Sequence, residues 1–175
     1  MNTLSHIPTI TTQRLILRPL DMEDRDALFQ ISQEENIFRY FPTQGAWSMQ
    51  KVEIYIQHQS AHWSRYKYGH WAVTMRETGQ LMGWDGLEFL PDTNETEVGY
   101  LFSKEFWGKG YATEATKSAV QFGLDNGLNE IIGLTHPDNI ASQRVLEKSG
   151  LSFTRRQFYF GMEMFRFSTQ GTGQE

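Results

Sequence analysis

Two glycines, Gly108 and Gly110, stand between a β-prone run at 95–102 and a helical pattern that starts near residue 113. Glycine lets the main chain approach a ligand with no β-carbon in the way. The free N–H groups of a first helical turn also carry partial positive charge. This strand, glycine turn and helix start therefore predict an anion cradle that is suited to a phosphate, formed by main-chain groups from Gly110 to Thr113.

Spacing separates the kinds of phosphate turn that use glycine. A P-loop needs Lys and then Ser or Thr after its second glycine, but Tyr111 follows Gly110 here. The dinucleotide-binding fingerprint needs a third glycine at the position of Thr113. Neither pattern fits, and the glycine pair by itself is equally compatible with an ordinary tight turn between a strand and a helix.

A second segment, residues 136–151, has the sequence signals of a complete helix. Asn139 is the predicted N-cap, Lys148 lies near the end, and Gly150 is the predicted C′ stop. An N-cap uses only the side-chain oxygen of Asn139, so its amide N–H₂ stays available to a ligand.

The two segments together resemble the GNAT superfamily of N-acetyltransferases. The family's acetyl-CoA signature and the motif that follows it fall on Trp107, Gly110 and Ala112, and on Asn139, Ser142, Glu147 and Gly150. The run Phe106-Trp-Gly-Lys-Gly-Tyr-Ala-Thr-Glu-Ala115 is similar to the RimJ/RimL-type branch, which acetylates ribosomal-protein N-termini and related amines. With the opening Thr12-Gln-Arg-Leu-Ile-Leu-Arg-Pro19, the resemblance covers nearly the whole chain.

This resemblance implies a GNAT fold and the transfer of an acetyl group from acetyl-CoA, as co-substrate, to a primary amine by direct attack. The acceptor would be a protein N-terminal α-amine or a small amine, and no metal is implied. The implied coenzyme-binding residues are Tyr100, Phe102, Trp107, Gly108, Lys109, Gly110, Tyr111, Ala112, Thr113, Asn139 and Ser142.

Within that set, the backbone groups of Tyr100 and Phe102 would pair with the pantetheine amides as an added strand would. Gly99 is the candidate weak point or bulge that opens the strand edge, and a glycine that only relieves packing is the equal alternative. Trp107 stands where the wider family has Gln or Arg, as is common in this branch, and we expect it to pack beneath the glycine turn.

Attack on a thioester requires a neutral amine, yet an alkyl amine with a pKa near ~10 is mostly protonated at neutral pH. Glu97, on the strand that leads to the turn, is the predicted base, acting directly or through water as the family's carboxylate often does. A solvent-facing glutamate on a strand is the competing interpretation. Glu114 and Glu147 are alternatives, but both positions have ordinary structural uses in helices.

The departing thiolate needs a donor, and the family's frequent tyrosine acid would fall on Leu146. Ser142 is therefore the predicted second catalytic group, protonating or hydrogen-bonding the sulfur. The missing tyrosine keeps open another class of function, an acyl-CoA-binding sensor module without turnover.

Composition limits the other options. The chain has 175 residues, a formal net charge of −5 and no cysteine. The charge disfavours nucleic-acid binding and mildly favours a cationic acceptor. The lack of cysteine excludes disulfides, thiolate metal sites and an acyl-cysteine relay. His58 and His62 lie one helical turn apart but have no obvious third metal ligand, so solvated helix residues are favoured.

Neither a secretory leader nor an apolar run approaching the roughly 18 residues of a membrane span is evident, so a cytoplasmic location without membrane partners is the default expectation. A homodimer is compatible with the sequence, but no feature requires one.

The element pattern predicts one α+β domain over residues 9–168, with flexible termini at 1–8 and 169–175. Its sheet would be mixed, mainly antiparallel and twisted, with about six to seven strands flanked by about four helices. The predicted helices begin at Asp21, Ser48, Thr113 and Asn139, and the predicted strands cover 14–19, 70–75, 81–89, 95–102, 130–134 and parts of 153–167.

Overall fold

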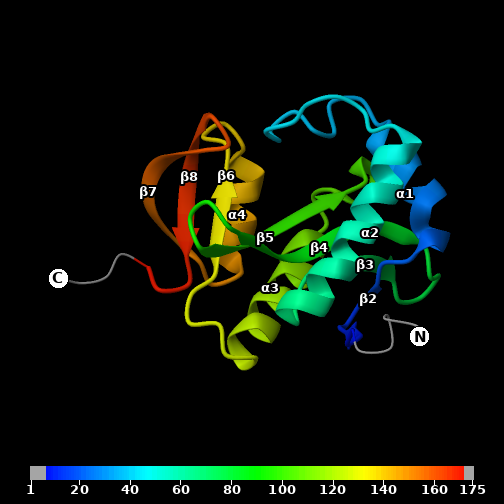
Figure 1. The fold of residues 1–175 in the computed structure, drawn as a ribbon, viewed down its shortest axis with the longest axis horizontal. Coiled ribbons are helices and arrows are strands. Elements are labelled where there is room, and N and C mark those ends of the chain that lie inside the picture. Colours follow the sequence, from blue (N-terminus) through cyan, green and yellow to red (C-terminus); the bar gives the residue numbers. More distant parts are fainter. Residues whose placement is uncertain (1–6, 172–175) are drawn as a thin grey trace.

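The computed structural model describes residues 7–171, which form one open, eight-stranded sheet with helices on both faces (Figure 1). The strand order is β1-β2-β3-β4-β5-β6-β8-β7, and every neighbouring pair is antiparallel except β5 with β6. The strands are β1 Ile10–Thr11, β2 Leu15–Pro19, β3 His70–Met75, β4 Leu81–Leu90, β5 Glu95–Phe102, β6 Ile132–Thr135, β7 Ser152–Tyr159 and β8 Met162–Ser168.

Within the described residues, four α-helices and two short 3₁₀ helices accompany the sheet. They are η2 Met22–Asp24, α1 Arg25–Ser32, α2 Met49–Tyr66, η3 Lys104–Phe106, α3 Tyr111–Asp125 and α4 Ile140–Lys148. The predicted α+β class, mainly antiparallel mixed sheet and four helices are confirmed. The additional strand is β1, whose two residues are too short to show a periodic pattern.

The residues of β5 alternate between two separate cores. Val98 and Phe102 lie in the core beneath α3, together with Ala115. Leu101 points to the opposite face and packs in the core beneath α1 and α2. Because neighbouring side chains on a strand point to opposite faces, β5 contributes to both sides of the molecule.

The junction between β5 and β6 is the narrowest part of the sheet. These parallel strands share one backbone register pair, Glu97 with Ile132, and then diverge. The predicted opening of the β5 edge is therefore present. The predicted bulge at Gly99 is wrong, since β5 stays in continuous register with β4 through Gly86 and Gly99.

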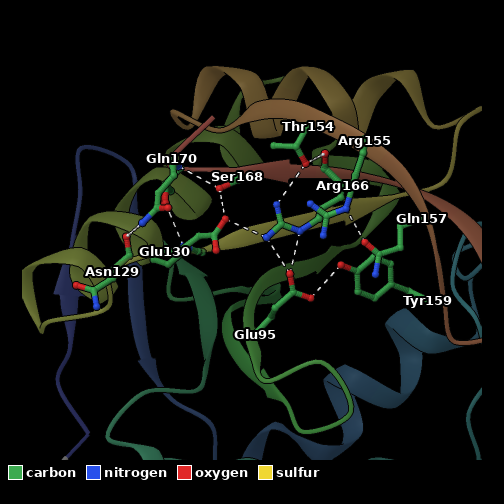
Figure 2. A network of polar contacts seen from close by, with 12 residues as sticks. Glu95, Asn129, Glu130, Thr154, Arg155, Gln157, Tyr159, Arg166, Ser168 and Gln170 are labelled. Carbon is green, nitrogen blue, oxygen red and sulfur yellow. Dashed lines mark hydrogen bonds and ion pairs between the residues drawn. The ribbon is translucent and has the colours of Figure 1, made fainter. Parts of the chain in front are cut away.

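A buried arginine fastens the closed end of this junction (Figure 2). Arg166 of β8 donates to Glu95 of β5 (2.9 Å) and to Glu130, which precedes β6 (2.9 Å). Its side chain is only 6% exposed. Tyr159 donates a further hydrogen bond to Glu95 (2.9 Å). Side chains therefore join the two parts of the sheet where the backbone contributes a single pair.

The ion pairs determine the protonation of this cluster. Burial opposes ionisation of Glu95, but hydrogen bonds from Thr93, Arg166 and Tyr159 outweigh it and lower the pKa of Glu95. The pKa of Glu130 is lowered in the same way, with Ser168 and Arg166 outweighing burial. Both carboxylates are therefore ionised opposite the arginine at neutral pH.

Both ends of the described chain are held by hydrogen bonds. Trp71 donates from its indole N–H to the Pro8 carbonyl (2.8 Å), and the Thr169 N–H donates to the Ile131 carbonyl (3.0 Å). Flexibility was predicted for 1–8 and 169–175, of which 1–6 and 172–175 lie outside the described residues.

Replacing Arg166 with Met should lower the free energy of unfolding by about 3–5 kcal/mol at pH 7, because two partly buried carboxylates lose their cation. Urea denaturation measures the loss. Arg156→Met is the matched control: its side chain is 66% exposed, its partner Glu163 lies 3.7 Å away, and about 1 kcal/mol or less should be lost.

The deficit of Arg166→Met should shrink below about pH 4.5, the ordinary pKa of a glutamate. A depressed folded-state pKa stabilises the fold above the unfolded-state value, and this stabilisation is lost as the pH falls. Equal losses for the two arginine variants, or a deficit that does not change with pH, would contradict this role.

Candidate active site

The turn that leads into α3 presents a row of free main-chain donors. Gly108 (φ 72°) and Gly110 (φ 80°) adopt the left-handed conformation, which glycine tolerates best. Within residues 7–171, the N–H groups of 108–113 donate no hydrogen bond of normal geometry, and the first helical bond runs from Glu114 to the Gly110 carbonyl (3.1 Å). Gly110 is the N-cap and has no side chain to satisfy these donors. The turn therefore leaves unpaired the main-chain donors that the predicted cradle requires.

The tryptophan beside the glycine turn does not lie where the sequence predicted. Trp107 is 53% exposed, so the prediction that it packs beneath the turn is wrong. Phe106, only 6% exposed, packs there with its ring centroid 6.1 Å from that of Tyr111. The intervening 3₁₀ helix η3 turns the tryptophan outward, where its indole N–H donates to the Phe102 carbonyl (2.8 Å). Lys109 donates from Nζ to the Glu105 carbonyl (2.7 Å).

Within residues 7–171, no strand pairs with β5 on the β6 side beyond the Glu97–Ile132 pair. Tyr100 and Phe102, which were predicted to pair with an extended ligand, lie on this open stretch. The Phe102 carbonyl already accepts a hydrogen bond from the Trp107 indole N–H. Of the two residues, Tyr100 therefore has the backbone groups more available to a ligand.

The Tyr100 hydroxyl connects β5 to α4. It donates to Ser142 Oγ (3.0 Å), while Asn139 caps α4 by accepting from the Ser142 N–H (3.2 Å). Burial, opposed by the Ser142 hydrogen bond, raises the pKa of Tyr100, so this phenol stays protonated. The sequence assigned only a backbone role to Tyr100, although strand alternation from Val98 and Phe102 already directed its side chain toward the α3 and α4 face.

Leu146, at the position of the family's frequent tyrosine, is buried under β6. It is 1% exposed, and a β-carbon added at Gly133 would come within 2.5 Å of its side chain. A phenol enters this neighbourhood from β5 instead, at Tyr100.

Glu97 and Glu88 form a cross-strand pair on the face of the sheet that carries α1 and α2. The partly buried Glu97 side chain accepts from the Leu134 N–H of β6. Burial chiefly raises the pKa of Glu97 to about 8, with Glu88 and Glu95 adding to the shift and the Leu134 hydrogen bond opposing it. Within residues 7–171, no cationic side chain contributes to this shift. Glu97 can therefore exchange a proton near neutral pH.

Glu88, by contrast, is held ionised by groups from α2 and β3. His58 Nε2 lies 2.7 Å and the Gln59 amide 2.8 Å from its oxygens, and His70 Nε2 lies 3.7 Å away. Burial opposes ionisation, but His70, His58 and Gln59 outweigh it and lower the pKa of Glu88. Two neighbouring carboxylates with pKa values shifted in opposite directions are typical of acid-base sites.

His62 is not available to a metal. Its Nδ1 lies 2.8 Å from the Tyr68 carbonyl, and its Nε2 accepts from the Phe89 N–H (3.0 Å), which assigns a neutral ring protonated on Nδ1. Among residues 7–171, no group of three or more His, Cys, Asp or Glu side chains could hold a metal ion.

Aromatic side chains line the α1 and α2 side of β4. His70 stacks on Trp84 with ring centroids 4.4 Å apart, and Tyr55 donates or accepts a hydrogen bond at His70 Nδ1 (2.9 Å). Trp63, Trp71 and Trp84 are buried in the core, whereas Trp47 is partly exposed.

The long connection between α1 and α2, drawn cyan in Figure 1, arches toward the part of the sheet that contains β6 and β8. Tyr40 on this connection stacks on His136, which precedes α4, with ring centroids 5.3 Å apart. The contact bridges the two sides of the opening above β5. None of the helices within residues 7–171 has the length and apolar character that a membrane crossing requires.

The comparisons with known proteins agree with this geometry. A family model for the acetyltransferase (GNAT) domain matches residues 14–152. The chain therefore belongs to the GNAT family of acetyltransferases, as the motifs predicted.

Individual relatives and structures support the family assignment. The Bacillus subtilis uncharacterized N-acetyltransferase YoaA is 30% identical over 145 residues, covering 82% of each chain. The Aspergillus fumigatus FsC-acetyl coenzyme A-N(2)-transacetylase is 28% identical over 166 residues, covering 89% of this chain and 70% of that protein. The ribosomal L7/L12 alpha-N-protein acetyltransferase RimL, solved with coenzyme A, shares the fold: TM-score 0.78, 15% identity, 92% of this chain and 97% of that one.

The raised pKa of Glu97 predicts a pH-dependent stability. Its folded-state value of about 8 lies above the ordinary value of 4.5, so its contribution is fully present below about pH 4.5 and is lost as the pH rises toward 8. Glu97→Gln lacks this loss and should gain stability relative to the wild type across that window, as measured by urea denaturation at several pH values. Parallel stability curves for the two proteins would contradict the shift.

Proposed function

We propose that this protein is an acetyl-CoA-dependent N-acetyltransferase that acts in the cytoplasm on a primary amine, either a protein N-terminal α-amine or a small amine. The observation that carries the proposal is the row of free N–H groups at 108–113 beside the open edge of β5. Two names support the choice of coenzyme: the RimL structure contains coenzyme A, and the Aspergillus relative is named for acetyl coenzyme A.

In this proposal, the cradle binds the pyrophosphate of the coenzyme. Its donors are main-chain groups of Gly108, Lys109, Gly110, Tyr111, Ala112 and Thr113. The pantetheine arm follows the open edge of β5 and pairs mainly with Tyr100, since Phe102 shares its carbonyl with Trp107. Asn139, whose side-chain oxygen caps α4, would contribute its amide N–H₂ to the other side of the arm.

Glu97 is the proposed base. It lies on the α1 and α2 side of the sheet, opposite Tyr100 and Ser142, so an amine that arrives from that side meets the carboxylate before the thioester. A base whose pKa lies near the working pH combines a useful ionised fraction with good proton affinity. The ionised Glu88 and the aromatic wall around Trp84 favour a cationic or amine-bearing acceptor there.

Ser142 is the proposed donor to the leaving sulfur. Because Ser142 Oγ accepts from Tyr100, its own hydrogen is free to point at the thiolate. In the reaction, the amine nitrogen bonds to the carbonyl carbon and the carbon–sulfur bond breaks. The nitrogen gives a proton to Glu97, directly or through water, and the sulfur takes one from Ser142, after which solvent restores both groups.

Gly110→Glu should weaken coenzyme A binding more than about 100-fold, because a carboxylate would enter the anion cradle. Gly79→Glu is the matched control: both glycines have a left-handed φ (80° and 75°), and a β-carbon at Gly79 meets nothing within 4 Å. Calorimetry with coenzyme A measures both. Equal affinity for Gly110→Glu and the control would remove the cradle from the proposal.

Thiol release from acetyl-CoA with a panel of N-terminal peptides and small amines tests the activity. At saturating amine, kcat should rise as the pH passes through about 8, the pKa of Glu97, and level off above it. Glu97→Gln should lose about 10²–10⁴ in rate together with this dependence. Glu147→Gln, at an exposed position late in α4, should match the wild type. Tight coenzyme binding with no turnover on any amine would indicate the sensor module instead.

A further inference from the structure

The cradle is connected to the first strands of the chain through Arg14. This residue lies between β1 and β2, almost 100 positions before the turn, and its Nη1 donates to the Lys109 carbonyl (2.9 Å). Its guanidinium also lies 4.3 Å from the centroid of the Tyr111 ring. Arg14 therefore contacts both the glycine turn and the first residue of α3.

The same side chain is oriented by a carboxylate in the first turn of α3. Glu114 Oε2 accepts from Arg14 Nε (2.7 Å), and Glu114 Oε1 accepts from the Arg14 N–H (2.8 Å) and from Thr12 Oγ1 (2.7 Å). Burial opposes ionisation, but hydrogen bonds from Thr12 and Arg14 outweigh it and lower the pKa of Glu114. Glu114 is thus fully engaged and unsuited to act as the base.

The bond to the Lys109 carbonyl fixes the peptide between Lys109 and Gly110. In a trans peptide the C=O and N–H point in opposite directions, so a carbonyl held toward Arg14 leaves the Gly110 N–H facing away from Arg14, toward the cradle. With glycines at 108 and 110, few steric barriers oppose rotation of this peptide plane. A rotated plane would place a carbonyl oxygen among the donors and repel a phosphate.

We propose that Arg14 is a positioning residue that keeps the Lys109–Gly110 peptide oriented for binding the anionic part of the coenzyme, without contacting the coenzyme itself. Arg14 also balances the charge of Glu114, which would otherwise oppose an anion at this helix start. A guanidinium suits this bridging task because its fixed fork of donors serves a carboxylate and a carbonyl together. The inference rests on the proposed coenzyme binding.

Arg14→Met should weaken coenzyme A binding about tenfold in calorimetry, the effect of losing one charge-assisted hydrogen bond. The KM for acetyl-CoA should rise by a similar factor while kcat at saturation stays near the wild-type value, because the lost interaction acts on binding alone. Arg14→Lys, which keeps a charge beside Glu114, should also bind several-fold more weakly, since one ammonium cannot reproduce the fork.

Arg25→Met is the matched control. The Arg14 and Arg25 side chains are both 40% exposed, and Arg25 forms an ion pair with Glu53 between α1 and α2 (3.1 Å). This control should bind coenzyme A like the wild type.

These experiments separate failure of the proposed function from failure of the proposed role of Arg14. A wild-type protein that does not bind coenzyme A overturns the proposed function. A wild-type protein that binds, together with a folded Arg14→Met or Arg14→Lys variant of unchanged affinity, overturns the role of Arg14 alone. A fall in kcat at saturation with unchanged KM would also overturn it.

Discussion

The single backbone pair between Glu97 and Ile132 is the constraint on which the proposed active site depends. If β5 and β6 stayed paired beyond this point, the backbone groups of Tyr100 and Phe102 would form hydrogen bonds with β6. No free strand edge would then remain for a ligand. If the strands shared no pair, the elements that follow β5 and β6 would not be held beside each other. The Arg166 cluster holds the two strands together where the backbone forms only one pair. Its ion pairs join β5, β8 and the start of β6 at the closed end of the junction. Burying the Arg166 guanidinium is costly unless it is paired, and here two partly buried carboxylates accept its hydrogen bonds.

Glu97 connects this architectural point to the proposed chemistry. Its backbone forms the last pair before the strands diverge, and its carboxylate takes the Leu134 N–H at the point where the ladder stops. The same location removes it from water and places it beside the ionised Glu88, which accounts for the raised pKa. A carboxylate that terminates the pairing of two strands is thereby given the proton affinity that an amine-activating base requires.

Local signals in the sequence predicted local structure well. Asn139 caps α4 and Gly150 follows it with a φ of 95°, because a helix end is specified by the few residues around it. The left-handed turn at Gly108 and Gly110 follows from the same kind of information. Interactions across the sheet could not be predicted in this way. The pairing of Glu88 with Glu97 depends on the register of β4 and β5, and the contact of Arg14 with Lys109 joins residues 95 positions apart.

The two wrong predictions, for Trp107 and Gly99, have similar causes. Trp107 was judged by its motif position, whereas η3 turns it outward, and Gly99 was expected to bulge, whereas the strands simply diverge. Family resemblance supplied the coenzyme and chemistry that residue spacing alone left open.

The narrow junction also links the stability of the fold to the proposed coenzyme. Strands β1 to β5 lie on one side of the junction and β6, β8 and β7 on the other, so a coenzyme bound along the β5 edge and reaching α4 would hold the two sides together. Binding that is restricted to the native state adds stability in proportion to the logarithm of ligand concentration. The proposed enzyme would accordingly be most resistant to heat and proteolysis in cells where acetyl-CoA is abundant, and its cellular lifetime would follow the metabolic state.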